Sequence, residues 1–161
     1  MKLTATYKGL ITGAAMILVS LFLFYGLKKA HNDSSQMLVI MIYIAGIVWS
    51  LLSFRKKQSG ELSFKSFFSE GFRTFIVATL IMVIYTAVFY KLNGQILAEA
   101  IKDNEAIINA QGDRTAAEIA ENSEKLKSIF MPMTISITTV TYLLFGAVTS
   151  VIGGLFLRKA K

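Results

Sequence analysis

The chain has 161 residues, of which 54% are hydrophobic, and it carries a formal net charge of +7 with one proline and no cysteine. This length suits one small domain, and the missing thiols exclude disulfides, thiolate zinc sites, iron–sulfur clusters and cysteine nucleophiles. In a soluble protein the charge would indicate nucleic acid, but here the basic residues flank long apolar runs. We therefore interpret the charge as membrane topology and attraction to anionic lipid headgroups, and we predict no nucleic-acid partner.

Four stretches contain no charged residue: 9–27, 34–54, 74–90 and 128–157. A bilayer core is about 30 Å thick, so a spanning helix needs roughly 20 predominantly apolar residues. A helix also satisfies its backbone polar groups within its own segment, which lipid requires. The sequence therefore predicts an all-α fold, a four-span transmembrane helical bundle that makes residues 1–161 a single integral membrane domain.

The first two spans are expected at about 9–27 and 34–54. The first run is longer than the apolar core of a signal peptide and lacks a small-residue cleavage site, so we expect it to be a retained span. His31, the only histidine, falls between these spans. We interpret it as a solvated loop residue, because the chain has no second histidine for a metal site and no supported Ser–His–Asp set.

An aromatic segment precedes the third span, and its phenylalanines share one helical face: Phe64, Phe67, Phe68, Phe72 and Phe75. Basic residues line another face, which predicts an interfacial helix over about 62–73. A structural role for this helix is favoured over specific lipid recognition. Gly71 is expected to bend the chain into a third span at about 72–90, lengthened by snorkelling of Arg73.

The third connection has a helical pattern and a break, and we predict an outer helical segment over about 92–130. The break falls near Gly112, and Thr115 with Glu118 has the spacing of a capping box. We predict an extracytoplasmic helical hairpin between spans 3 and 4, which either caps the bundle or binds a partner. The fourth span is expected at about 131–157, and the uncharged residues before it continue the hairpin because the whole run exceeds the bilayer thickness.

Small residues recur at four-residue spacing in three of the predicted spans: Gly9 and Gly13, Gly46 and Ser50, and Gly146, Ser150 and Gly154. Such residues let helices approach closely, and hydroxyl groups can form hydrogen bonds across the contact. Packing within one chain is the favoured interpretation, and a homodimer face is the alternative.

No charged residue or histidine lies inside the four runs, which argues against ion pathways and proton relays at membrane depth. One soft-ligand idea remains open, because Met37, Met41, Met131 and Met133 are expected at one membrane level and thioethers bind Cu(I). Methionine as an apolar filler is the favoured interpretation. The sequence therefore predicts no catalytic, cofactor-binding or metal-binding residue.

The distribution of lysine and arginine predicts the orientation. If both termini are cytoplasmic, the inner side holds ten of these residues and the outer side seven, several of them far from the span ends. Basic residues near span ends favour the cytoplasmic side. We therefore expect an inner-membrane, multi-pass protein with cytoplasmic N- and C-termini, although Lys28 and Lys29 run against the rule.

The order of these features resembles a bacterial membrane protein family, domain of unknown function 4199. The resembling segments are Gly-Leu-Ile-Thr-Gly at 9–13, the aromatic segment 62–72, the long charged outer segment, and Gly-Gly-Leu-Phe-Leu-Arg-Lys at 153–159. The resemblance covers nearly the whole chain. It implies a four-span inner-membrane protein and supplies no activity, ligand or catalytic residue.

The sequence leaves three classes of function to compare. The favoured hypothesis is a non-enzymatic accessory or scaffold subunit with the lipid bilayer as its environment and a protein partner at the outer hairpin or at the inner aromatic helix. The alternative is a small transporter or channel for an uncharged or hydrophobic solute. An enzyme acting on lipids is the third, but no nucleophile or acid–base set converges in the sequence.

Overall fold

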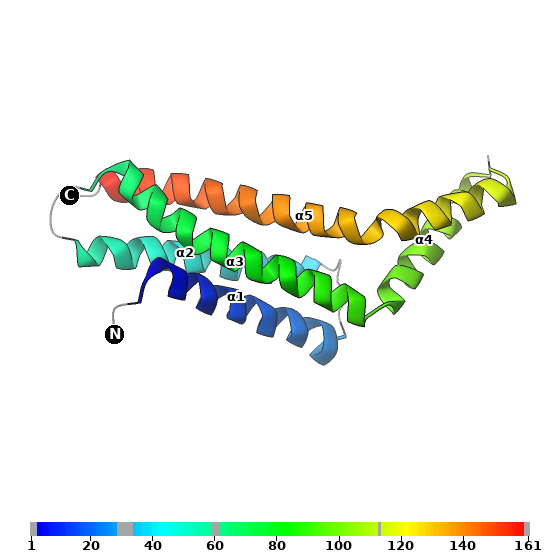
Figure 1. The fold of residues 1–161 in the computed structure, drawn as a ribbon, viewed down its shortest axis with the longest axis horizontal. Helices are drawn as coiled ribbons and strands as arrows, with labels where there is room; N and C mark the ends of the chain where they lie inside the picture. The colour runs from blue at the N-terminus through cyan, green and yellow to red at the C-terminus, as the bar shows by residue number, and fades with distance from the viewer. Residues whose placement is uncertain (1–2, 29–33, 59–61, 113, 160–161) are drawn as a thin grey trace. The chain divides into compact units, whose positions relative to one another are not determined.

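The computed structural model describes residues 3–28, 34–58, 62–112 and 114–159. All the regular secondary structure in these ranges is helical (Figure 1). Five α-helices follow in chain order: α1 (Ala5–Leu21), α2 (Met37–Lys57), α3 (Phe64–Leu92), α4 (Gln95–Gln111) and α5 (Ala116–Lys159). A π-helical turn, Phe22–Gly26, extends α1, and a 3-10 turn, Ser34–Gln36, precedes α2.

Four helical segments are long and apolar enough to cross a membrane: Ala5–Gly26, Ser34–Lys57, Phe64–Leu92 and Ala116–Arg158. The prediction of an all-α chain with four membrane-spanning candidates is confirmed. Each segment is longer than the uncharged run with which it overlaps, because helical hydrogen bonding continues into the flanking polar residues. The 29 residues of α3 extend over about 44 Å at 1.5 Å per residue.

The expected interfacial helix over 62–73 is wrong as a separate element. Its residues form the first turns of α3, which continues through Gly71 without a break. The reason is packing: Phe67 and Phe75 are 1% and 2% exposed, so these two rings are buried against other helices of the chain, whereas Phe72 is 45% exposed. Gly71 lies against Ser150 of α5, and a Cβ added at this glycine would be 2.5 Å from Ser150 Oγ.

The contacts of the chain divide it into two compact units, residues 1–82 with 139–161 (unit 1) and residues 83–138 (unit 2). Within unit 1, α1, α2, the first part of α3 and the last part of α5 run alongside one another (Figure 1). Unit 2 contains α4, the last turns of α3 and the first part of α5.

Glycines allow the helices of unit 1 to approach closely, as the small-residue spacing predicted. A Cβ added at Gly9 would lie 2.6 Å from the carbonyl oxygen of Thr74 on α3, and one added at Gly13 would lie 2.9 Å from Ile81. Gly46 of α2 lies directly against the Thr12 side chain. These glycines therefore serve packing within one chain.

A buried tyrosine joins three helices in the middle of unit 1. Tyr43 on α2 donates a hydrogen bond to the carbonyl oxygen of Tyr142 on α5 at 2.8 Å, and its hydroxyl lies 2.9 Å from Thr79 Oγ1 on α3. Tyr43 is fully buried, so these bonds satisfy a hydroxyl that would otherwise be costly to bury. Gly146, one turn beyond Tyr142, leaves the space that this hydroxyl occupies.

Unit 2 pairs α4 with the first turns of α5. Asn122 Nδ2 donates to Asn104 Oδ1 at 2.9 Å, and Ser123 Oγ donates to Glu105 Oε1 at 2.6 Å. The break between the two helices is at Gly112, whose φ of 71° places it in the left-handed region that favours glycine. The predicted break is therefore confirmed.

The predicted capping box at the start of α5 is also confirmed. The Thr115 amide donates to Glu118 Oε2 at 2.7 Å, and the Glu118 amide donates to Thr115 Oγ1 at 3.4 Å. The hydrogen bonds from the backbone and the hydroxyl of Thr115 lower the pKa of the exposed Glu118 carboxyl, which precedes the expected span at 131–157.

Several helix ends meet at one end of unit 1. Lys57 Nζ donates to the carbonyl oxygen of Leu3 at 3.1 Å, and Arg55 donates to the carbonyl oxygen of Leu157 near the end of α5. The start of α1 and the ends of α2 and α5 therefore lie together (Figure 1). Basic side chains at the ends of α2 and α5 also complement the negative ends of the helix dipoles.

Candidate functional site

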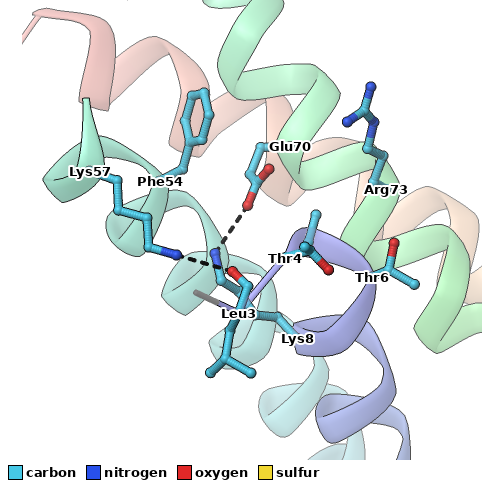
Figure 2. Close-up of a pocket in the computed structure, with 9 residues that line it drawn as sticks. Leu3, Thr4, Thr6, Lys8, Phe54, Lys57, Glu70 and Arg73 are labelled. Atoms are coloured by element: carbon cyan, nitrogen blue, oxygen red, sulfur yellow. Dashed lines mark hydrogen bonds and ion pairs between the residues drawn. The ribbon is translucent and has the colours of Figure 1, made fainter. Parts of the chain in front are cut away.

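A buried ion pair lies between α1 and α3 near this end of unit 1. The Thr4 side chain caps α1 by accepting a hydrogen bond from the Tyr7 amide, and Lys8 follows within the first turns. Lys8 is only 1% exposed, although lysine is almost never fully buried without a partner. Its Nζ lies 3.0 Å from Glu70 Oε1 on α3 (Figure 2).

Serine and threonine hydroxyls complete the environment of the ion pair. Lys8 Nζ donates to the carbonyl oxygen of Ser50 on α2 at 3.2 Å and approaches Ser50 Oγ at 3.5 Å. The Ser50 hydroxyl lies 2.7 Å from Thr74 Oγ1 and 3.3 Å from Glu70 Oε1. Three helices thus contribute to one polar cluster, which we call the Lys8 cluster: Lys8, Ser50, Glu70 and Thr74.

The Lys8 cluster matches donors to acceptors. An ammonium group has three donors, and Lys8 has a carboxylate, a carbonyl and a hydroxyl oxygen around it. Glu70 accepts from both the ammonium and a hydroxyl, and Thr74 Oγ1 also donates to the carbonyl oxygen of Glu70 at 3.0 Å. A buried ion pair with its hydrogen bonds made resists the loss of either partner, because a lone buried charge is costly.

Small side chains bring the backbones close enough for these bonds. Gly9 follows Lys8 directly and packs on the backbone of Thr74, so α1 and α3 touch at the level of the cluster. One turn further, Thr12 Oγ1 donates to the carbonyl oxygen of Lys8 at 2.8 Å while its side chain packs on Gly46. The polar cluster and the glycine contacts are therefore one packing arrangement.

An open pocket of about 310 Å³ lies beside the ion pair. Its walls come from the start of α1, the end of α2 and the first turns of α3 (Figure 2). The lining residues are Leu3, Thr4, Ala5, Thr6, Lys8, Phe54, Lys57, Glu70 and Arg73. Hydroxyl, apolar and charged side chains thus share one cavity.

The pocket carries an excess of positive charge. Lys8, Lys57 and Arg73 are cationic, and Glu70 is the only acidic residue of the lining. Since Lys8 and Glu70 compensate each other at 3.0 Å, Lys57 and Arg73 remain as uncompensated charges. Both side chains are exposed, and Arg73 has no hydrogen bond or ion pair within the described part of the chain.

Sequence reasoning missed the Lys8 cluster. It assigned Lys8 to the flanking positive charge and Glu70 to an interfacial helix, whereas the structure places both inside candidate spans. A signal was present: Glu70 is a single carboxylate between phenylalanines, followed directly by Gly71. The predicted role of hydroxyl groups in helix contacts was correct for Ser50, which bonds Thr74 across the interface of α2 and α3.

Of the other residues singled out by the sequence as ligand candidates, the structure describes the methionines. His31 lies outside the described residues. Met37 and Met41 are 60% and 61% exposed on α2, and Met133 of α5 is 41% exposed in unit 2. Over the described ranges, no three His, Cys, Asp or Glu side chains are grouped to hold a metal ion.

A comparison with protein families matches residues 7–159 to the family described as "Protein of unknown function (DUF4199)". The chain belongs to this family. The match includes Lys8, the whole aromatic segment and the end of α5, and it confirms the resemblance drawn from the sequence. Searches of curated proteins and of solved structures found no significant match.

Proposed function

We propose that this member of the family is a non-enzymatic accessory or scaffold subunit of the bacterial inner membrane. Unit 1 would anchor the chain, with both termini in the cytoplasm, and α4 with the start of α5 would form an extracytoplasmic hairpin that meets a partner. The observation that carries this proposal is the Lys8 cluster. Its charges are bonded to each other and to neighbouring helices, which is the arrangement of a group that holds a bundle together.

The surface of α4 supports a contact with a partner protein. The polar side chains of Asn104 and Glu105 accept hydrogen bonds from α5. Glu99, Asp103 and Ile107 are exposed, and Ile107 is 59% exposed although it is large and apolar. A partner that covers this face would bury Ile107 in the contact and leave the carboxylates at its polar rim.

Purification of the tagged chain in a mild, non-denaturing detergent tests the proposal. We expect a partner protein to co-purify in a fixed ratio, and the substitution Ile107→Lys to release it. Ala120→Lys introduces the same side chain at an exposed position of α5 and should keep the partner if the exposed face of α4 makes the contact. A homo-oligomer without other subunits that moves an uncharged solute across liposomes would contradict the proposal and favour the transporter alternative.

A further inference from the structure

The helical hairpin of unit 2 has a weaker interior than the helices of unit 1. Of the 17 residues of α4, all of which the structure describes, only Ile108 is buried. Residues 116–130 of α5, where α5 pairs with α4, include no buried residue. By contrast, α1 is equally long and buries seven residues. Burial of apolar surface is the main force between helices in water, so little of this force holds α4 against α5.

The middle of the contact between α4 and α5 is a polar layer. Asn122 Nδ2 donates to Asn104 Oδ1 at 2.9 Å, and Ser123 Oγ donates to Glu105 Oε1 at 2.6 Å. All four side chains belong to half-buried residues. Polar pairs of this kind fix the register of two helices, but their net contribution to stability is small because each replaces hydrogen bonds to water.

Apolar residues flank the polar layer on the same face of α4. Leu97, Ile101 and Ile108 lie at i, i+4 and i+11, and Asn104 lies between them at i+7. Leu97 and Ile101 are half-buried, and Ile108 is 8% exposed. The closed hairpin therefore covers an apolar stripe of α4, formed by Leu97, Ile101 and Ile108.

Both ends of α4 are short joints. Only Asn93 and Gly94 connect it to α3, and no atom lies within 4 Å of the place that a Cβ of Gly94 would take. At the other end, Gly112 has a φ of 71°. In Figure 1, α4 runs alongside the start of α5 and leaves α3 through the first of these joints. Hinges consist of a few such residues at the ends of elements, so α4 can move as a rigid rod.

We propose that α4 is a clasp, closed on α5 through the polar layer, that opens and recloses while unit 1 stays folded. The open state uncovers the apolar stripe of α4, whereas the outward face with Ile107 is exposed in the closed state. The hairpin thus presents an additional, apolar surface only when it is open. The proposal does not depend on the scaffold role, because opening is a property of the chain alone.

Cysteine labelling at two neighbouring positions measures the opening, since the chain has no native cysteine. Ile107 is 59% exposed and Ile108 is 8% exposed. In the full chain in a mild detergent, Ile108→Cys should react with a maleimide roughly 10–1,000-fold more slowly than Ile107→Cys, because it reacts only when the hairpin is open. Equal rates would mean that the hairpin is never closed, and no labelling of Ile108→Cys within a day would mean that it does not open. Either result would overturn the proposal.

A buried position of unit 1 separates local opening from unfolding of the whole chain. Ile47 of α2 is 0% exposed, so Ile47→Cys should stay unlabelled while Ile108→Cys reacts. Equal labelling of the two would mean global unfolding, contrary to the proposal. Hydrogen exchange of the unaltered chain gives the same comparison without a substitution. The amides of α4 should exchange before those of α2, and equal protection of the two helices would contradict a local opening.

Replacement of the polar layer should hold the clasp closed. Asn104→Leu with Asn122→Leu exchanges a hydrogen bond for an apolar contact and should slow the labelling of Ile108→Cys roughly tenfold. The matched control, Asn109→Leu with Ser128→Leu, places the same side chains at exposed positions of the two helices and should leave the rate within about twofold. Equal slowing by both double substitutions, or none by the first, would refute a clasp that opens at its polar layer.

Discussion

Lys8 is a flanking positive charge in the sequence, but in the folded chain its side chain forms a buried ion pair between helices. Its ammonium lies between Glu70 of α3 and the backbone of α2, so one residue joins three helices. The methylene groups of a lysine are apolar, and here they cross the buried layer while the charge reaches its partners. The ion pair therefore cross-links α1 and α3, and the loss of either residue is expected to destabilise the bundle.

Removal of one partner should destabilise the chain more than removal of both. We expect Lys8→Met to lower the free energy of unfolding by up to about 3–5 kcal/mol, because it leaves the Glu70 carboxylate, whose side chain is only 13% exposed, without its charge partner. Lys8→Met combined with Glu70→Met should recover part of this loss. Unfolding in denaturing detergent, followed by circular dichroism, measures the difference.

An exposed lysine serves as the control for that cycle. Lys65→Met on α3 removes the same charge and should change the free energy of unfolding by no more than about 0.5 kcal/mol. If the double substitution destabilised the chain by the sum of the effects of Lys8→Met and Glu70→Met, the two residues would act independently, contrary to the ion-pair interpretation.

At the level of elements, the helices of unit 1 fit together because small side chains on one helix face larger side chains on the next. Gly9 and Gly13 of α1 face α3, and Gly46 of α2 faces Thr12 of α1. Gly146 of α5 leaves space for Tyr43 and Phe75. In lipid, helix association depends on such close packing and on interhelical hydrogen bonds, since the apolar environment gives little additional driving force.

The contact at Gly146 predicts sensitivity to added volume. A Cβ at this position would lie 2.5 Å from Tyr43 Oη and 2.6 Å from Phe75 Cγ, so Gly146→Leu should displace α5 from α2 and α3. We expect destabilisation of at least about 1–3 kcal/mol, seen as a lower yield of monodisperse protein in size-exclusion chromatography.

An exposed residue of α5, Val148, provides the control for Gly146→Leu. Val148 on the same helix is 47% exposed, so Val148→Leu adds volume without entering the helix contact. Its yield should match that of the unaltered chain. A normal yield for Gly146→Leu as well would show that the contact is not required for folding.

At the level of the whole molecule, the chain combines a closely packed unit 1 with a more polar unit 2. Helix ends at one end of unit 1 are joined by Arg55 and Lys57, which donate to the backbone near the C-terminus and N-terminus. In unit 2, two side-chain pairs join α4 to α5. This division suits the proposed roles of an anchor and a partner-binding segment.

Single-cysteine variants test the proposed orientation, and the chain has no native cysteine to remove. Cysteine at Asn109 of α4 should react with a membrane-impermeant maleimide in cells whose outer membrane is permeabilised. Cysteine at Gln58, just after α2, should react only after the inner membrane is disrupted. Both positions are exposed, so accessibility within the fold does not limit the reaction. The opposite pattern of labelling would invert the orientation.

The class of fold follows from the sequence, because the length of an apolar run and the need of a chain in lipid to form helix are local properties. The four candidate spans, the break at Gly112 and the capping box of Thr115 and Glu118 follow from residues close in the chain. The separate interfacial helix was wrong, since local periodicity cannot show that Phe67 and Phe75 are buried by other helices. Only the tertiary structure joined Lys8 to Glu70, because 61 residues separate them and their pairing depends on how α1 packs on α3.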